Sequence, residues 1–292
     1  MVNHFSHMPL LRRLWQNPVH AAIGEVGKPM DMPVNKFKRA IHESRTIFGA
    51  WLVSGAPSTA EALGCAGFDF LVVDMEHTPV DTPEMVELLR TIAGTPAQAV
   101  VRLVWNDMVW LKRVLDGGAQ TVLLPFVQNA EEAKRAVACT RYPPDGIRGV
   151  AGSHRGSRFG TVPDYLKTAA QELCVMVQIE TQAALANLPA IAAVPGVDSI
   201  FIGPSDLAAS MGLLGDVANP AVQEKLNAAA IQCRQLGKPC GILGTNPEMT
   251  AKFIEYGYNW IAIGSDMAFM VGRAQEWLGK AKAAPPAGAR SA

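Results

Sequence analysis

The chain has 292 residues, of which 49% are hydrophobic and 18% are charged. This composition supplies enough apolar side chains for a full globular core and carries too little charge for a disordered chain. The 26 basic residues balance the 26 acidic ones, which argues against nucleic acid as a partner, because a protein that binds it must neutralise phosphates. No apolar run approaches the ~18 residues that a membrane-spanning helix needs, so no membrane association is expected.

The five cysteines are scattered along the chain, without a C-x-x-C pair. An odd number in this arrangement indicates neither a disulfide framework nor a zinc site. A reducing compartment, the cytoplasm, fits this pattern best.

The two ends of the chain differ in composition from the middle. Residues 1–45 carry seven Lys or Arg residues against three acidic ones, and no long apolar segment follows the basic residues as it would in a secretory signal. We expect residues 1–45 to be a loosely ordered extension, residues 46–281 to form the folded domain, and residues 282–292 to be a disordered tail.

Eight short apolar runs follow one another through the middle of the chain. Each is nearly continuous in apolar residues, as is typical of parallel strands that are covered on both faces. The runs begin at Phe48, Phe68, Ala97, Thr121, Leu173, Asp198, Lys238 and Trp260.

The segments between these runs have helical periodicity. It predicts helices over residues 83–92, 108–115, 221–236 and 247–256, several of them ending at a glycine. Eight βα units in about 235 residues match an α/β fold of the (β/α)8 type, the TIM barrel. An open doubly wound sheet is the alternative, but the segment after the first run lacks its phosphate-binding glycine spacing.

One connection, residues 140–172, is long and rich in Pro, Gly and Arg. A connection of this length in a compact domain is usually functional. Because we take it to follow the fourth strand, we expect it to begin on the C-terminal face of the barrel, where barrel enzymes have their sites. Its His154, Arg155 and Arg158 are as readily explained by a solvated loop as by a binding role.

Polar residues gather at the C-terminal ends of the second, third, fifth and sixth runs. They are Asp74, Glu76 and His77 at the second, Arg102 at the third, Gln178 and Glu180 at the fifth, and Gly203, Pro204, Ser205 and Asp206 at the sixth. We therefore expect the functional site in this sector of the barrel.

Glu180 and Asp206 form a pair of carboxylates at neighbouring strand ends. Buried carboxylates in such positions repel each other unless a cation lies between them. Because no His or Cys stands beside them, a hard divalent ion such as Mg²⁺ or Mn²⁺ suits the pair. The alternative is that each residue caps the helix that follows it.

His77 and Arg102 are the other candidates for chemistry. His77 lies in a cluster of three ionisable groups directly after an apolar strand, which favours a site. Arg102 interrupts an apolar strand and must meet an anion, either a bound ligand or the carboxylate of Asp74 or Glu76. No lysine stands at a strand end in this sector, which argues against a Schiff-base enzyme.

Five motifs resemble, in their order along the chain, those of the HpcH/HpaI aldolase/citrate lyase family, and most closely its class II pyruvate aldolases. They are DMEHTPVD, VVRLVWND, TRYPPDGIRGV, VQIET and GVDSIFIGPSDLAASMG. The resemblance implies a metal-dependent lyase that cleaves 4-hydroxy-2-oxo acids to pyruvate and an aldehyde, without an organic cofactor. Examples are 4-hydroxy-2-oxoheptanedioate, met in the breakdown of aromatic compounds, which gives succinate semialdehyde, and 2-dehydro-3-deoxyglucarate, which gives tartronate semialdehyde.

The same resemblance implies roles around the metal. Glu180 and Asp206 match the ligands of Mg²⁺, Mn²⁺ or Co²⁺, and Asp74 and Glu76 resemble residues that hold metal-bound waters. The family also implies a homo-oligomer, a hexamer or trimer, with the C-terminal helix exchanged between subunits and neighbouring subunits completing the pocket.

For proton transfer and substrate binding, the resemblance assigns three residues. Arg102 matches the arginine that contacts the keto oxygen of pyruvate, His77 matches the base, and Asp116 matches the carboxylate that pairs with His77. Further contacts to the small 2-oxo acid substrate are expected from Trp51, Gln178, Gly203, Pro204 and Ser205.

The chain departs from the family pattern in two places, and the first bears on substrate size. Many relatives have glycine where this chain has Met75, and Leu103-Val104 replaces variants that contain proline. Met75 would place a bulky side chain near the site.

Alternatives to the aldolase remain within the same superfamily. A citrate-lyase or malyl-CoA-type lyase would also use Glu and Asp for Mg²⁺, although nothing in the sequence marks a site for CoA or a carrier. A phosphoenolpyruvate-using carboligase is the second alternative enzyme. A non-catalytic barrel would require the loss of Glu180, Asp206 or Arg102, and all three are present.

Overall fold

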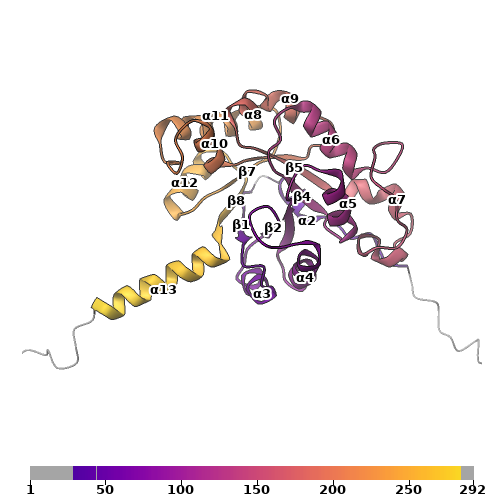
Figure 1. Ribbon diagram of the computed structural model, residues 1–292, viewed down its shortest axis with the longest axis horizontal. Helices are drawn as coiled ribbons and strands as arrows, with labels where there is room; N and C mark the ends of the chain where they lie inside the picture. Colours follow the sequence, from indigo (N-terminus) through magenta and orange to yellow (C-terminus); the bar gives the residue numbers. More distant parts are fainter. Residues whose placement is uncertain (1–28, 44, 284–292) are drawn as a thin grey trace, which may run out of the picture.

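The computed structural model of the protein describes residues 29–43 and 45–283, and its centre is one closed parallel barrel (Figure 1). Each strand pairs with the next along the chain, and the last pairs with the first. The strands are β1 (Ile47–Leu52), β2 (Phe70–Asp74), β3 (Gln98–Arg102), β4 (Thr121–Leu124), β5 (Cys174–Ile179), β6 (Ser199–Ile202), β7 (Cys240–Leu243) and β8 (Trp260–Ser265). The predicted TIM barrel is confirmed.

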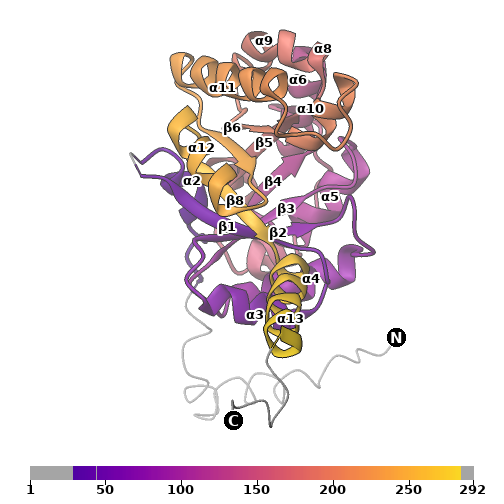
Figure 2. The ribbon, with the colours of Figure 1, turned by 90° about the vertical axis from the view of Figure 1, so that its left-hand side faces the viewer.

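Helices surround this barrel, as the two views in Figures 1 and 2 show. The four helices predicted from periodicity are present within one residue of their predicted ends. The helices beside the strands are α3 (Pro57–Cys65), α4 (Thr82–Ile92), α5 (Met108–Asp116), α6 (Ala130–Thr140), α8 (Gln182–Ala186), α9 (Leu188–Ala192), α10 (Pro204–Ser210), α11 (Pro220–Gln235), α12 (Pro247–Tyr256) and α13 (Asp266–Ala283).

The strands are apolar on both faces because they separate two cores. Side chains such as Phe70 and Val72 fill the barrel interior, whereas Leu71 and Val73 pack outward under the helices. Since side chains alternate along a strand, Asp74 shares the inward face of β2 with Phe70 and Val72. The strand pattern thus directs a buried carboxylate to the C-terminal mouth of the barrel.

The segment before β1 corrects our expectation of a loose extension over residues 1–45. Residues 36–40 form helix α2 (Lys36–Ala40), whose Phe37 is buried and meets the rings of Phe70 and Trp260 edge-on at centroid distances of 5.3 and 5.6 Å. Asn35 caps this helix and donates from Nδ2 to Thr121 Oγ1 at 3.0 Å. Burial of an aromatic ring outweighs the polar composition of its neighbours, so this segment is the floor of the barrel.

Parts of the two predicted terminal segments lie outside the described residues, namely residues 1–28 and 284–292. Of the predicted tail, residues 282 and 283 belong to the last turn of α13.

The long connection also differs from expectation. Helix α6 lies between β4 and this segment, so the connection begins at Arg141, on the N-terminal face of the barrel and not on the C-terminal face. It contains the short helices η2 (Arg155–Gly160), α7 (Tyr165–Thr168) and η3 (Ala169–Glu172). Consequently His154, Arg155 and Arg158 lie at the opposite end of the barrel from the strand-end carboxylates.

Helix α13 projects away from the barrel in Figure 1. Its first residue, Asp266, is buried and accepts hydrogen bonds from the backbone N–H groups of Val53 and Ser54 at 2.9 and 3.2 Å, which ties the helix to β1. Farther along, several large apolar side chains are exposed: Met267, Met270, Val271, Trp277 and Leu278. Within the described ranges, no helix is both long and apolar enough to cross a membrane.

Candidate active site

The centre of the site is an ion pair between the ends of β2 and β3. Asp74 and Arg102 are directly opposite each other in the strand register. Arg102 Nε donates to Asp74 Oδ1 at 2.9 Å and Nη2 donates to Oδ2 at 2.6 Å, a bidentate pair. Of the two anions that we expected for Arg102, a bound ligand or a nearby carboxylate, the structure shows the carboxylate of Asp74.

Glu76 and Trp51 complete the surroundings of this guanidinium. Glu76 Oε2 lies 3.0 Å from Arg102 Nη1 without forming a hydrogen bond. The ring of Trp51, on β1, lies under the guanidinium, whose central carbon is 5.0 Å from the ring centroid. Asp74 holds two of the three guanidinium nitrogens, and the third, Nη1, is paired in charge with Glu76 but donates no hydrogen bond to it. The N–H groups of Nη1 can therefore donate to a ligand.

Glu180, immediately after β5, is held by two donors. Its Oε1 accepts from the backbone N–H of Phe126 at 2.7 Å and its Oε2 accepts from Gln178 Nε2 at 2.6 Å. The carboxylate also requires glycine at position 203, because a Cβ there would lie 2.7 Å from Glu180 Oε2. Gln178 and Gly203, which we expected to contact the substrate, thus lie against this carboxylate.

Phe126 is a site residue that sequence reasoning missed. It has a left-handed backbone conformation, with φ of 57°, which aims its N–H at Glu180 and is uncommon for a bulky residue. Its ring stacks on Trp105 at a centroid distance of 5.6 Å, and both rings are exposed. Only its position directly after β4 could have suggested a role.

Asp206 and Ser205 lie in the first turn of α10 and are exposed, whereas Pro204 is buried. Asp206 forms no hydrogen bond or ion pair with any described residue. Neither carboxylate forms a capping hydrogen bond, because α8 is capped by Thr181 and α10 has no side-chain cap. Asp206 nevertheless stands in the first turn of α10, where an acidic residue is favoured.

Four carboxylates lie near one another here. Burial raises the pKa of Glu76 to about 7 against the lowering effect of Arg102, and the charges of Asp74 and Asp206 contribute further to the rise. Burial likewise raises the pKa of Glu180 to about 7, aided by the charges of Asp206 and Glu76 and opposed by its two hydrogen bonds. The site therefore holds more negative charge than its single arginine balances.

This donor set fits a divalent cation. Each Glu180 oxygen accepts one hydrogen bond and keeps a second lone pair, Asp206 is unpaired, and Gln178 Oε1 is buried without a partner. No group of three His, Cys, Asp or Glu side chains with metal-binding geometry occurs among residues 29–43 and 45–283. A two-carboxylate site suits Mg²⁺, which keeps several of its waters.

His77 and Asp116 lie at opposite ends of the barrel, so the pairing implied by the family resemblance does not occur within one chain. The His77 side chain is 67% exposed, and its Nε2 is 3.9 Å from Glu76 Oε2. Asp116, at the end of α5, instead accepts from the buried Arg148 at 2.7 Å and lies 3.7 Å from His154 Nε2.

The bulk of Met75 does not enter the site. Its side chain is buried in the outer core with Leu71 and Val73. Because side chains alternate along a strand, Met75 points away from the barrel interior into which Asp74 projects. The expectation that Met75 places a bulky side chain near the site is therefore wrong.

Comparisons with known proteins place these features in a family. The profile of the HpcH/HpaI aldolase/citrate lyase family matches residues 47–272. The chain is 48% identical to the 2-dehydro-3,6-dideoxy-6-sulfogluconate aldolase of Pseudomonas putida, over 79% of this chain and 90% of the relative. It is 46% identical to the 5-keto-4-deoxy-D-glucarate aldolase of Salmonella arizonae, over 80% and 91%.

Solved structures agree. A crystal structure of an HpcH/HpaI aldolase/citrate lyase family protein from Burkholderia cenocepacia has a TM-score of 0.83 and 36% identity, covering 86% of this chain and all of that one. A more distant fold match, with a TM-score of 0.51 and 16% identity over 80% and 97%, is the citrate lyase beta subunit of M. tuberculosis in complex with oxaloacetate and magnesium. The extent of the sequence match and the shared barrel establish that this chain belongs to the HpcH/HpaI aldolase/citrate lyase family.

Proposed function

We propose that this protein is a divalent-metal-dependent aldolase that cleaves 4-hydroxy-2-oxo acids to pyruvate and an aldehyde. The observation that carries the proposal is the placement of Glu180 and Asp206 beside Arg102 at the C-terminal mouth of the barrel. Two anionic ligands and one cation at a single mouth suit the binding of a chelating 2-oxo acid.

Glu180 and Asp206 would hold the cation, which supplies a Lewis acid for the negative charge that develops on the keto oxygen during C–C cleavage. Gln178 and the Phe126 N–H orient Glu180. Their hydrogen bonds fix the carboxylate before substrate arrives, so little reorganisation is needed in the reaction.

Arg102 would bind the same keto oxygen through Nη1. Its bidentate bond to Asp74 holds the guanidinium plane, and Trp51 supports one face. A donor that is already fixed toward a developing oxyanion stabilises the transition state more than a mobile donor does.

His77 would accept the proton of the C4 hydroxyl. It is exposed at the mouth and near Glu76, so the ring is accessible to substrate. Histidine is the side chain most often used for proton transfer of this kind.

We also propose that the protein works as a homo-oligomer, a hexamer or trimer, in the cytoplasm. Asp116 is remote from His77 of its own chain, and α13 carries exposed apolar side chains beyond the barrel. A neighbouring subunit that supplied Asp116 and covered α13 would account for both features. Light scattering coupled to gel filtration tests the assembly.

For the substrate we propose a sugar-derived 4-hydroxy-2-oxo acid, since both curated relatives are aldolases of such acids. The test is an assay in which lactate dehydrogenase reports pyruvate. Protein treated with EDTA and then supplied with Mg²⁺, Mn²⁺ or Co²⁺ is assayed with 2-dehydro-3-deoxyglucarate, its 6-sulfo relative, 4-hydroxy-2-oxoheptanedioate and malyl-CoA. Cleavage of only malyl-CoA, or full activity without metal, would contradict the proposal.

A further inference from the structure

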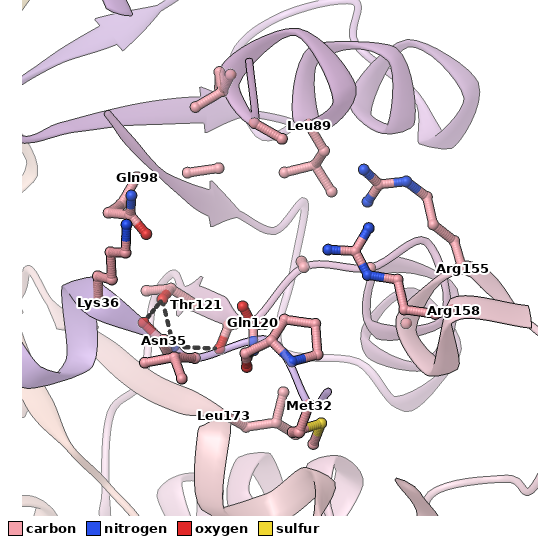
Figure 3. Close-up of a pocket in the computed structure, with 18 of the residues that line it drawn as sticks. Met32, Asn35, Lys36, Leu89, Gln98, Gln120, Thr121, Arg155, Arg158 and Leu173 are labelled. Atoms are coloured by element: carbon pink, nitrogen blue, oxygen red, sulfur yellow. Dashed lines mark hydrogen bonds between the residues drawn. The ribbon is translucent and has the colours of Figure 1, made fainter. Parts of the chain in front are cut away.

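A cavity of about 270 Å³ lies at the N-terminal end of the barrel, beneath β3 and β4 (Figure 3). Its walls come from the segment before α2, the end of α4, the starts of β3 and β4, and the long connection. This is the face opposite the strand-end carboxylates, so the cavity is separate from the active site of its own chain.

Three cations line the cavity, and no Asp or Glu does. Arg155 and Arg158 extend into it from η2, and Lys36 stands on the opposite wall (Figure 3). Within the part of the chain that the structure describes, none of the three forms an ion pair. The cavity therefore concentrates positive charge that the described side chains do not neutralise.

The position of Arg155 is built into the fold. Its side chain is half-buried and its Nη1 donates to the carbonyl of Gly117 at 3.1 Å. The next residue, Gly118, has φ of +100°, and a Cβ there would lie within 2.4 Å of the same nitrogen. Glycine thus makes room for the guanidinium.

Electrostatics around Arg155 are unfavourable without a ligand. Burial lowers the pKa of Arg155, and the nearby positive charges of Arg158 and Arg90 lower it further. An anion that binds between these cations would relieve their mutual repulsion and stabilise their charged forms.

We propose that this cavity binds a small multivalent oxyanion, a phosphate or a dicarboxylate, at a site distinct from the catalytic one. Guanidinium groups match both chemistries, because their N–H donors pair with two oxygens at once. The volume falls just below the usual range for pockets that take drug-sized ligands. The remaining walls are mixed, with the side-chain amides of Gln98 and Gln120 as well as the apolar Leu89, Ile92 and Leu173. The ligand is therefore a compact anion, whose oxygens can also accept hydrogen bonds from amides.

The test is calorimetric titration of the full-length protein with inorganic phosphate and, separately, with succinate, at an ionic strength held constant with sodium chloride. We expect saturable binding of at least one of the two anions. Arg155→Ala and Arg158→Ala should each weaken that binding by roughly tenfold or more, the loss expected for a charged hydrogen-bonding partner. Phosphate alone, succinate alone or both identifies the oxyanion chemistry that the site accepts.

Two variants separate this site from others. Lys252→Ala removes an exposed cation on α12 and should leave binding unchanged. Arg102→Gln removes the guanidinium charge of the catalytic face and should also leave it unchanged, whereas loss of binding there would assign the anion to the active site and overturn the proposal. Absence of saturable binding, or unaltered binding in both η2 variants, would overturn it as well. Because Arg158 is exposed, its variant remains informative if Arg155→Ala fails to fold.

Discussion

Arg102 and Asp74 face each other across neighbouring strands and form two hydrogen bonds, of 2.9 and 2.6 Å, in the buried mouth of the barrel. The pair gives Arg102 a fixed orientation and neutralises a carboxylate that is 1% exposed. Removing one partner leaves an uncompensated buried charge, which typically costs about 3–5 kcal/mol.

From this pair we expect Arg102→Ala to lose both stability and ligand binding. The free energy of unfolding should fall by roughly 3–5 kcal/mol, and oxalate, an analogue of the pyruvate enolate, should inhibit poorly. Urea unfolding and inhibition assays measure the two effects. Arg102→Lys is the control that restores charge but not the bidentate bond, and wild-type oxalate inhibition in Arg102→Ala would contradict the binding role.

His77→Ala should affect rate and spare binding. Loss of a general base typically reduces turnover by ~10²–10⁴-fold, whereas the exposed ring holds no other described side chain in place. Turnover of a 4-hydroxy-2-oxo acid and inhibition by oxalate are measured together. If oxalate inhibition weakens as severely as in Arg102→Ala, His77 is a binding residue instead of the base.

Gly203→Ala should disable the metal site although it replaces no metal-ligand residue. The added methyl group would press against Glu180, with its Cβ 2.7 Å from Oε2, and so displace the carboxylate. We expect weaker Mg²⁺ binding by calorimetry and a loss of activity comparable to that of Glu180→Gln. Gly272→Ala is the matched control, since a Cβ at position 272 in α13 meets no atom within 4 Å.

In metal-free protein, stability should fall as pH rises from about 4.5 to about 7. The pKa of Glu180 and of Glu76 is about 7 in the folded chain against an ordinary 4.5, so in this interval the folded state holds protons that the unfolded state has released. Their contribution is complete below the lower value and is lost as pH passes through the upper one. Urea unfolding in EDTA across this range measures the slope. Glu180→Gln should make the dependence of unfolding free energy on pH shallower. Stability that rises with pH over this range in the unsubstituted protein would contradict the raised pKa of the two glutamates.

Phe37→Ala tests whether helix α2 belongs to the fold. Truncating a buried aromatic residue typically costs about 3–5 kcal/mol, and Phe37 touches two rings in the barrel interior. Thermal and urea unfolding give the change. Phe159→Ala, at a ring that is 67% exposed, should cost far less, and equal effects of the two substitutions would show that α2 adds nothing.

The sequence predicted the barrel well because its strands are buried on both faces, and runs such as FLVVD show this without ambiguity. It also predicted that Asp74, Arg102 and Glu180 lie at the same end of the barrel, since parallel strands end at one mouth. Helix α2 was missed because only Phe37 and Ile41 are core residues among polar neighbours. The long connection was expected on the C-terminal face because no helix was predicted between it and β4, where α6 lies.

Other features depend on distant contacts that no local pattern records. The left-handed conformation of Phe126 follows from its bond to Glu180, 54 residues away. The partner of Asp116 is Arg148, which comes from the connection on the N-terminal face. Family motifs single out Asp116, but only the fold reveals which end of the barrel it occupies.

Closure of the barrel by β1 and β8 has a consequence for how the chain is made. Ile47 lies beside Trp260 in the strand register, so the first and last strands can pair only after nearly the whole domain has left the ribosome. Until then β1 and β7 present open edges that invite pairing with other chains. Contacts of such long sequence separation also slow folding. The nascent protein is therefore exposed to aggregation up to its last strand, and a chaperone that shields strand edges should raise its yield.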